Sequence, residues 1–356
     1  MMHKLSLAVL FLVLAVPVCG QSGRVKPSET PTPTPTPRRI TGSGGYHPTE
    51  KVSSDASLPS SQAKPQQDDG VITVESNLVP IPVSVLDQRG RAIGSLTLQD
   101  FLLQVDGQPV EIGELSRSES PVRLALLFDN SSSVTIAREF EKKAAIKFFR
   151  RVIRPEKDLV ALFSVATTSR LEQPLTKDVS SLITAIENFA APDGATALLD
   201  GLVEAANYLN GADGRRIVVI VSDGDDTISD SSFDAAMKAL LVSNCQVYVV
   251  KTTDFENYKR TGQRGGNANI RQLAAERRMQ EITRQTGGAV FSPLDEAELE
   301  AAFAQISAEL SQQYVLSYYP ENETDKRGQF RTISLSIKDR PDFTVRTRKG
   351  YYVPRR

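Results

Sequence analysis

The stretch LALLFDNSSSVTIAREF, residues 124–140, passes from an apolar segment into a polar loop and then into a helical pattern. Every position from Leu124 to Phe128 is apolar, which is typical of a strand buried on both faces of a sheet. Comparable apolar segments occur at 158–166, 216–223, 246–252 and 288–292. Helical patterns separate them, at 134–153, 179–189, 197–210, 231–243, 268–286 and 295–310. Residues 121–310 are therefore predicted to form an α/β domain with a doubly wound, mostly parallel sheet.

The helix predicted at 134–153 has one clear apolar stripe. Phe140, Ala144 and Phe148 recur at a spacing of four residues, which places them on one face of a helix. We expect this stripe to face the sheet. The polar residues of the same segment are expected to face solvent, namely Glu139, Glu141, Lys142 and Lys143.

The segments on both sides of 121–310 have the period-two pattern of strands. In region 71–118, Val79, Ile81, Val83 and Val85 alternate with other residues, and Pro80 and Pro82 favour an edge strand. The spacing from Thr97 to Asp100 predicts a capping box, and residues 101–112 predict a hairpin. Region 311–356 has two further alternating runs, at 314–318 and 333–337.

Region 71–118 holds too few strands to be stable alone, because small isolated sheets bury little apolar surface. We therefore predict that 71–118 and 311–356 pair into a smaller β-sandwich-like module, into which the α/β domain is inserted.

The first seventy residues have a different composition. Residues 1–20 carry a basic start and an apolar run from Leu5 to Val16, which predicts a signal peptide cleaved after Gly20. A lipid anchor at Cys19 is the less favoured alternative, because the bulky Val18 precedes it. Residues 21–70, with TPTPTPTP at 30–37, predict a disordered linker rich in Pro, Thr and Ser. The protein is thus expected to be exported to the periplasm, the cell surface or the medium, with no transmembrane helix in its mature chain.

Composition excludes several classes of function. The formal net charge is −1 and the basic residues are scattered, so the sequence carries no electrostatic footprint for nucleic acid. The only histidines are His3 and His47, which lie outside 121–310. This excludes Ser-His or Cys-His catalysis and histidine-based zinc sites in the α/β domain. If Cys19 is removed with the signal peptide, Cys245 has no partner for an intramolecular disulfide.

Oxygen-bearing side chains follow two of the predicted strands and precede one helix. Asp129, Ser131 and Ser133 follow the first strand, Asp223 ends the strand at 216–223, and Thr196 lies in a Gly-containing loop. The carboxyl ends of parallel strands meet at one edge of a sheet, where α/β proteins bind ligands. Oxygen donors without imidazole or thiolate suit a hard cation, so we predict a Mg²⁺ site, with Mn²⁺ or Ca²⁺ as alternatives.

A purely structural interpretation is also open for each of these residues. The three serines at 131–133 could cap the following helix, and Thr196 could cap another. Asp223 and Gly224 could form a simple turn. We favour the metal site because all three loops are expected at the same edge of one sheet.

The combination DNSSS, Thr196 and SDG resembles the metal-ion-dependent adhesion site of von Willebrand factor A domains, over residues 121–310. The resemblance implies that Asp129 binds the ion directly or through water, that Ser131 and Ser133 are hydroxyl ligands, and that Thr196 and Asp223 complete the set. Two positions depart from the family, since Ser132 and Ala195 stand where glycine is frequent. The flanks, with LTLQDF, QQYVLSYYP and RKGYY, resemble a group of related proteins described chiefly from Acidobacteria.

The resemblance implies a protein-binding function and no catalysis. An Asp or Glu of a partner protein would complete the coordination of the ion, and residues 254–269 are expected to form a mobile loop beside it. One alternative is a structural module of the cell envelope whose metal only ties loops together, and a less favoured one is a metal-dependent hydrolase. A phosphotransferase of the haloacid dehalogenase type would require an Asp at Ser131. A glycosidase would require paired carboxylates, for which only Asp225, Asp226 or Glu281 could be nominated.

Overall fold

The computed structural model describes residues 78–355, except 118–119, 136, 264–269 and 321–323. The chain divides into two units, Met1–Gly70 and Val71–Arg356. The signal peptide predicted at 1–20, with Cys19, and the linker predicted at 21–70 lie outside the described residues.

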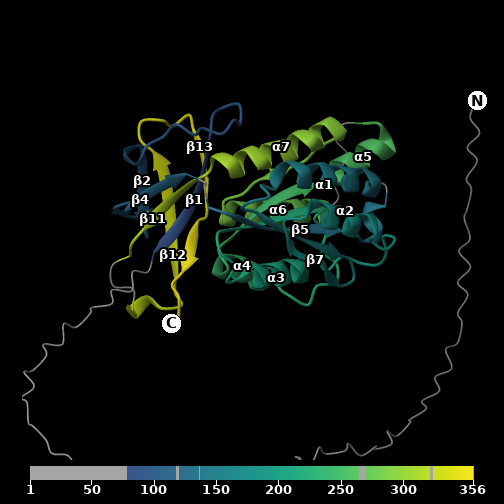
Figure 1. Cartoon of the computed structure of the whole chain (residues 1–356). Helices are drawn as coiled ribbons and strands as arrows, with labels where there is room; N and C mark the ends of the chain where they lie inside the picture. Colours follow the sequence, from purple (N-terminus) through teal and green to yellow (C-terminus); the bar gives the residue numbers. More distant parts are fainter. Residues whose placement is uncertain (1–77, 118–119, 136, 264–269, 321–323, 356) are drawn as a thin grey trace, which may run out of the picture. The chain divides into compact units, whose positions relative to one another are not determined.

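A six-stranded sheet forms the centre of the α/β region, in the order β10-β9-β8-β5-β6-β7. Figure 1 shows this sheet between the helices labelled α1 and α2 on one side and α3 and α4 on the other. All neighbouring strands are parallel except β6 and β7. The mostly parallel sheet predicted from the apolar segments is confirmed, and β7 is an additional antiparallel strand. The strands are β5 (Val122–Asp129), β6 (Leu159–Val165), β7 (Ser169–Thr176), β8 (Arg215–Ser222), β9 (Cys245–Lys251) and β10 (Val290–Phe291).

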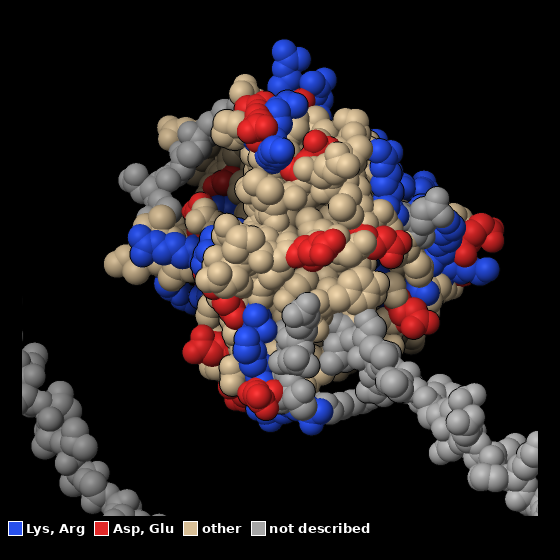
Figure 2. Space-filling model, turned by 90° about the vertical axis from the view of Figure 1, so that its left-hand side faces the viewer, with Lys and Arg blue, Asp and Glu red and all other residues tan. Residues whose placement is uncertain are grey.

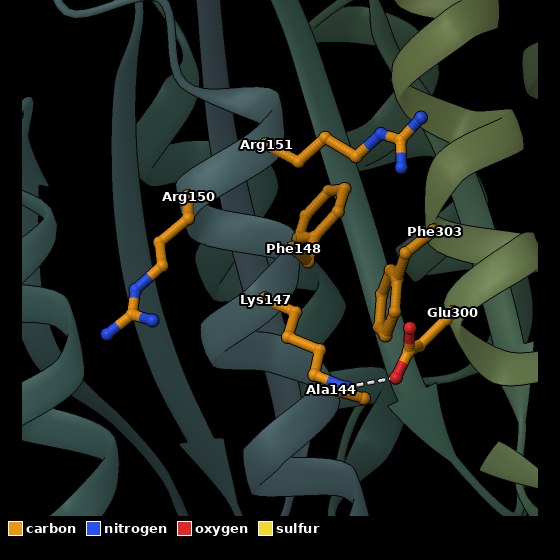
Figure 3. Close-up of a pocket in the computed structure, with 7 residues that line it drawn as sticks. All are labelled: Ala144, Lys147, Phe148, Arg150, Arg151, Glu300 and Phe303. Carbon is orange, nitrogen blue, oxygen red and sulfur yellow. Dashed lines mark hydrogen bonds and ion pairs between the residues drawn. The ribbon is translucent and has the colours of Figure 1, made fainter. Parts of the chain in front are cut away.

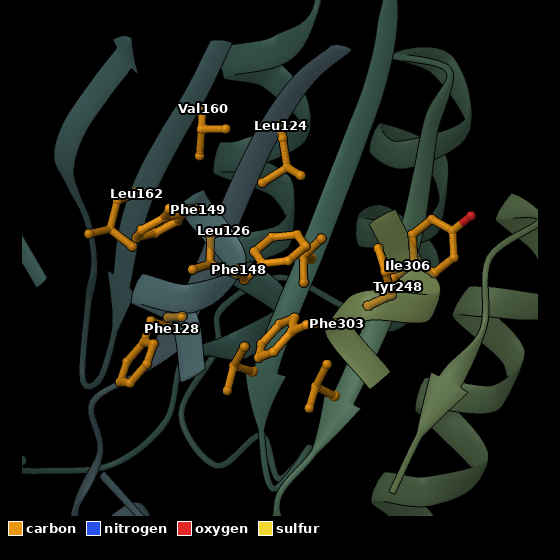
Figure 4. Close-up of a cluster of buried hydrophobic side chains, with 14 of the residues drawn as sticks. Leu124, Leu126, Phe128, Phe148, Phe149, Val160, Leu162, Tyr248, Phe303 and Ile306 are labelled. Atoms are coloured by element: carbon orange, nitrogen blue, oxygen red, sulfur yellow. The ribbon is translucent and has the colours of Figure 1, made fainter. Parts of the chain in front are cut away.

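Helices cover both faces of this sheet, so its central strands are apolar throughout. Leu124, Leu126 and Phe128 pack toward α1, α2 and α7, while Ala125 and Leu127 pack toward α3, α4 and α6. Figure 4 shows the first of these clusters, in which Phe148 and Phe303 lie beside each other. The helices are α1 (Arg138–Val152), α2 (Val179–Glu187), α3 (Leu198–Leu209), α4 (Phe233–Val242), α5 (Thr253–Thr261), α6 (Ile270–Thr286) and α7 (Glu296–Gln312).

The two flanking regions pair with each other, as predicted. β1 lies between β11 and β13 in one antiparallel sheet of order β13-β1-β11-β4, and β12 pairs with β2 in the other, of order β14-β12-β2-β3. Their facing side chains form one apolar core, which includes Ile81, Leu103 and Leu316. The strands are β1 (Val79–Leu86), β2 (Phe101–Val105), β3 (Gln108–Val110), β4 (Glu114–Arg117), β11 (Tyr314–Tyr318), β12 (Phe330–Ile337), β13 (Thr344–Thr347) and β14 (Gly350–Tyr352).

The prediction that β1 is an edge strand is wrong, although its prolines behave as the chemistry requires. β13 pairs with β1 only from Val83 onward, so the proline-containing half has a strand neighbour on one side alone. On the other side, the carbonyl of Pro82 accepts a hydrogen bond from Thr347 Oγ1 at 2.9 Å, and that of Pro80 accepts one from Arg348 Nη2 at 2.6 Å. Side chains thus satisfy the carbonyls where proline cannot donate to a ladder.

The capping box predicted at Thr97 and Asp100 is confirmed. Asp100 Oδ2 accepts hydrogen bonds from the Thr97 backbone N–H at 2.7 Å and from its hydroxyl at 2.8 Å. The helical turn that follows is short, Leu98–Asp100 (η1), and leads directly into β2.

A buried glutamine joins the sandwich to the central sheet. Gln313 lies between α7 and β11 and is 0% exposed. Its Oε1 accepts a hydrogen bond from Arg215 Nη1 at 2.9 Å, and its Nε2 donates to Ser84 Oγ at 3.1 Å and to Gln246 Oε1 at 2.9 Å. One side chain therefore connects the first strand of the sandwich to two strands of the central sheet.

Basic and acidic side chains are mixed on the surface of the sandwich that Figure 2 presents, with no continuous stripe of one sign. Within the part of the chain that the structure describes, no helix has the length and apolar composition needed to cross a membrane.

We expect Tyr314→Phe to lower the free energy of unfolding by about 1–2 kcal/mol, because it removes the acceptor of one partly buried N–H. Tyr314 Oη accepts a hydrogen bond from Leu96 N at 2.8 Å, while its ring packs edge-on against Phe101. Urea denaturation measures the change. Tyr319→Phe is the control, since Tyr319 is 47% exposed. Equal stability of the two variants would contradict the assignment of this hydrogen bond.

Candidate metal site

The loop after β5 brings a buried carboxylate and two hydroxyls together. Asp129 is 1% exposed, and its Oδ1 accepts a hydrogen bond from the backbone N–H of Ser131 at 2.9 Å. Its Oδ2 accepts one from the hydroxyl of Ser222 at 2.5 Å. Ser131 Oγ and Ser133 Oγ lie 2.9 Å apart. The alternation of these residues therefore folds their oxygens toward one point, as the sequence pattern predicts.

The serines do not cap helix α1. A short 3₁₀ turn, Ser132–Val134 (η2), follows β5, and α1 begins only at Arg138, with Ala137 at its N-cap position. The predicted helix start at residue 134 is therefore wrong. Neither Ser131 nor Ala137 makes a side-chain capping hydrogen bond. The hydroxyls of Ser131 and Ser133 hydrogen-bond to each other, so neither of them caps α1.

Asp223 follows β8, the strand next to β5, and so lies at the same edge of the sheet as Asp129. Its Oδ1 accepts a hydrogen bond from the backbone N–H of Asp225 at 2.9 Å, and Thr253 Oγ1 donates to its carbonyl at 3.0 Å. Gly224 has φ +81°, a conformation that glycine adopts without strain. The turn expected here is present, and it holds the carboxylate of Asp223 half-exposed beside the loop after β5.

Thr196 lies in the third loop and is 3% exposed. Helix α3 begins at Leu198 with Ala197 at its N-cap, so Thr196 does not cap it. Its backbone is fixed by Thr227, whose Oγ1 accepts from Thr196 N and whose N–H donates to Thr196 O, each at 2.9 Å. The carbonyl of Gly194 accepts from Ser132 N at 3.2 Å, which joins this loop to the one after β5. The three predicted loops thus meet at one edge of the sheet.

Burial and a neighbouring carboxylate both change the pKa of Asp129. Burial, and after it the negative charge of Asp223, raise the pKa of Asp129 from 3.8 to about 6. Hydrogen bonds from Ser222 and Ser131 oppose this shift of the pKa. Two carboxylates that repel each other in a buried place favour the binding of a cation between them.

Two further carboxylates lie near this edge. Glu141 on α1 is 0% exposed, so its expected exposure to solvent is wrong. It precedes Ala144, Ala145 and Phe148 by three, four and seven residues, which is the spacing of one helix face. That spacing is the signal that could have placed Glu141 on the buried stripe. Glu256 on α5 is half-buried, and its pKa is raised to about 8, first by burial and then by Asp223 and Asp129.

Much of the loop predicted at 254–269 is helical. Helix α5 covers Thr253–Thr261, and only 264–269 lie outside the described residues. Phe255 of α5 stacks on Phe140 of α1, with ring centroids 4.0 Å apart and planes 6° from parallel. The glycine-rich and amide-rich composition of residues 262–269 led to the loop prediction, although Phe255 packs the preceding residues as a helix against α1. A packed helix therefore stands beside the candidate site.

A hollow of about 300 Å³ opens at this edge of the sheet. The residues that line it include Ser133, Asp223 and Glu256, and also Arg260 and Arg271. Asp223 and Ser133 thus border the same opening, whereas Ser131 is buried behind it.

The donor set fits a small, hard cation. Octahedral Mg²⁺ holds oxygen ligands at about 2.1 Å, which puts neighbouring ligands about 3.0 Å apart. The hydrogen bond between Ser131 Oγ and Ser133 Oγ holds the two oxygens 2.9 Å apart, close to this spacing. Within the described residues, no group of three or more His, Cys, Asp or Glu side chains could hold a metal. A site here would therefore depend on hydroxyl ligands and two carboxylates.

The carboxylates nominated for an enzyme are engaged elsewhere. Asp225 pairs with Arg271 at 3.0 Å, and Glu281 pairs with Arg284 at 2.7 Å. Asp226 Oδ1 accepts hydrogen bonds from Leu199 N at 3.1 Å and from Ser229 Oγ at 2.5 Å. Each of these groups therefore has a structural role in a loop or on a helix surface.

A second hollow lies between α1 and α7, and has a volume of about 460 Å³ (Figure 3). Phe148 and Phe303 form its floor, with ring centroids 4.7 Å apart, and Lys147 and Glu300 form an ion pair at its rim. Its lining is apolar with flexible charged groups, so it does not share the chemistry of the loop after β5.

Comparison with known proteins identifies a domain within this region. Residues 124–225 match the family model of the von Willebrand factor type A domain. No curated protein matches the chain.

Several solved structures have a similar fold at low sequence identity. The PilB minor pilin from Streptococcus sanguinis is 14% identical, with a TM-score of 0.41 over 54% of this chain and 62% of the pilin. This chain therefore spans less than two thirds of that protein. An aerotolerance-related membrane protein from Bacteroides fragilis is 21% identical, with a TM-score of 0.41 over 54% of this chain and 99% of that one. The pilus adhesin SpaC from Lactobacillus rhamnosus GG is 10% identical, with a TM-score of 0.43 over 72% and 48% of the two chains.

Proposed function

We propose that this protein is an exported binding protein and not an enzyme, and that it captures a protein partner through a Mg²⁺-dependent adhesion site. The von Willebrand factor type A domain at residues 124–225 supports a role in protein interaction. The observation that carries the proposal is the pair of hydroxyls, Ser131 and Ser133, held 2.9 Å apart beside the buried Asp129.

In this proposal, Asp129, Ser131, Ser133, Thr196 and Asp223 hold the ion, with Mn²⁺ or Ca²⁺ as possible substitutes. The bound ion supplies a positive centre that keeps an exchangeable position. The role of Asp129 is to contribute one buried negative charge, fixed in orientation by Ser222 and by the backbone of Ser131. The half-exposed Asp223 faces the hollow from which a ligand enters. An Asp or Glu side chain of the partner would occupy the exchangeable position, giving a directional contact between opposite charges.

The alternative of a metal that merely ties the loops together has less support. Ser132 N–H already donates to the carbonyl of Gly194, and Asp193 N–H donates to that of Asn130 at 3.1 Å. These backbone contacts join the loops without an ion. A purely structural ion would therefore duplicate contacts that the chain supplies itself.

The test uses the full mature chain as bait on a bacterial cell-envelope extract. We expect a partner to be retained in excess Mg²⁺ and released by EDTA. Asp129→Asn should retain none, whereas Asp230→Asn, an exposed carboxylate of the loop after β8, should behave as the natural chain. Blocking the carboxyl groups of the extract with a carbodiimide and an amine should abolish capture. Retention that is equal in EDTA, or unchanged in Asp129→Asn, would contradict the proposal.

A further inference from the structure

A third hollow, of about 290 Å³, lies where the sandwich meets the amino edge of the central sheet. Its lining includes Pro80 and Pro82 of β1, and Arg215 and Arg216, the first two residues of β8. Among the described residues that line it, none is an Asp or a Glu, whereas the hollows at the metal site and between α1 and α7 each include at least one. This hollow is therefore lined by positive charge alone.

Arg215 is buried without a negatively charged partner. It is 6% exposed, and its Nη1 donates to two uncharged acceptors, Leu310 O at 2.8 Å and Gln313 Oε1 at 2.9 Å. Its Nε and Nη2 are buried and have no hydrogen-bond partner. These two nitrogens form one edge of the planar guanidinium, the kind of edge that binds an oxyanion through two parallel hydrogen bonds. The contacts of Arg215 thus fix its orientation but do not balance its charge.

Two further arginines border the same hollow. Arg348 is 6% exposed, and it donates to Pro80 O at 2.6 Å and to Asn244 Oδ1, both of which belong to residues that line the hollow. Its Nε has no partner. The half-buried Arg216 donates to two backbone carbonyls, each at 2.9 Å. Within the described part of the chain, every acceptor of these three arginines is an uncharged oxygen.

The electrostatics agree with this geometry. Burial lowers the pKa of Arg215 and that of Arg348 to about 10. Asp158 opposes the shift at Arg215, but it forms an ion pair with Arg154 at 2.7 Å, and the charge of Arg154 lowers the pKa of Arg215 by more. Positive charge that is removed from water and left uncompensated attracts an anion, most strongly in a cleft lined by one sign of charge.

We propose that this hollow binds a phosphate group, which contacts Arg216 and is attracted by the buried charges of Arg215 and Arg348. Arg216 makes the contact because it is only half-buried, whereas the other two arginines lie deeper. The planar guanidinium presents N–H groups in a geometry that matches the oxygens of phosphate. A phosphate group carries about two negative charges at neutral pH, so it balances more of this charge than a carboxylate does. Because residues of β1 and β8 both line the hollow, a bound phosphate would also tie the sandwich to the central sheet.

The test is calorimetric titration of the mature protein with inorganic phosphate. EDTA and a constant ionic strength exclude binding through a metal and changes in general screening. We expect saturable binding of one phosphate per chain. Arg216→Gln should weaken this binding by about tenfold, because it removes a hydrogen bond between charged groups. Arg89→Gln is the matched control, since Arg89 is an exposed arginine in the turn after β1, and it should bind phosphate as the natural chain does.

Glycerol 3-phosphate, titrated in the same way, distinguishes two sources of the phosphate group. Equal affinity for both compounds would support recognition of the free ion. Tighter binding of glycerol 3-phosphate, again weakened in Arg216→Gln, would support recognition of a phosphate group carried by a larger molecule.

Absence of saturable binding in the natural chain, or equal affinity in Arg216→Gln, would overturn the proposal. If Arg216→Gln does not fold, crystals of the natural chain soaked in tungstate, a heavy tetrahedral oxyanion, replace it. An anomalous peak beside Arg216 would then support the site, and its absence would overturn it. The adhesion site lies at the opposite, carboxyl edge of the sheet, so a failure of Mg²⁺ binding at Asp129 leaves this inference intact.

Discussion

Asp129→Asn is expected to abolish Mg²⁺ binding at the adhesion site and yet to raise the free energy of unfolding of the metal-free protein by about 3 kcal/mol at pH 7. The physical reason is that Asp129 is fully buried next to Asp223, which raises its pKa from 3.8 to about 6. An ionised Asp129 therefore costs stability until a cation binds. The amide removes the charge while keeping the shape, so the variant loses both the repulsion and the ligand.

The sign of the pH dependence follows from the same shift. The folded protein holds the proton of Asp129 up to about pH 6, whereas the unfolded chain releases it near 3.8. Between these values the folded state binds more protons, so the metal-free protein loses stability as the pH rises. Glu256, with a pKa raised to about 8, extends the decline toward neutral and mildly alkaline pH. Saturating Mg²⁺ should remove the part of the decline that belongs to Asp129.

Urea denaturation at several pH values, with EDTA or with Mg²⁺, measures these effects, and titration calorimetry measures the binding. The natural chain should gain stability on addition of Mg²⁺, and Asp129→Asn should not. Asp230→Asn, whose carboxylate is exposed, should respond to Mg²⁺ as the natural chain does. A destabilised Asp129→Asn in EDTA would show that the carboxylate is held by its hydrogen bonds more strongly than it is penalised by burial.

The sequence predicts the central sheet well because its strands are apolar at nearly every position. β5 and β8 are buried at every position except the second, which is an arginine in each, so burial and pattern agree. β7 was not predicted, because it is a half-exposed edge strand with no apolar face, of sequence SRLEQPLT. Helix α5 was not predicted either, because its single buried residue, Phe255, cannot produce the repeating apolar pattern of a helix face. A pattern can locate only those elements that bury several residues of their own.

The candidate site was predictable only in part, for a related reason. Asp129, Ser131 and Ser133 are adjacent in sequence, so their convergence requires only a loop after a strand. Ser222, by contrast, donates to Asp129 from a different strand, a contact fixed by the parallel pairing of β5 with β8. The spacing of Glu141 from Ala144 and Phe148 placed it on the apolar face of α1. Its charge nevertheless led to the prediction that it faces solvent. A buried charge is expected to be paired, and its partner comes from the tertiary structure.

Gln313→Ala is expected to lower the free energy of unfolding by about 3–5 kcal/mol, the largest loss that we predict for a polar residue. The substitution removes three hydrogen bonds at once and leaves buried atoms of Arg215, Gln246 and Ser84 with fewer partners. Arg215 would be affected most, since two of its nitrogens already lack partners and burial lowers its pKa to about 10.

The neighbouring Gln312 is the matched control for this prediction, because it has the same side chain in an exposed position on the last turn of α7. Gln312→Ala should change the free energy of unfolding by less than about 0.5 kcal/mol. Gln313→Glu distinguishes the contacts, since its carboxylate can still accept from Arg215 but cannot donate to Ser84 or Gln246. Because Gln313 joins β1 of the sandwich to β8 and β9 of the central sheet, its loss should also separate their unfolding into two transitions, followed by tyrosine fluorescence and by circular dichroism. A single transition with unchanged stability in Gln313→Ala would mean that apolar packing alone holds the two parts together.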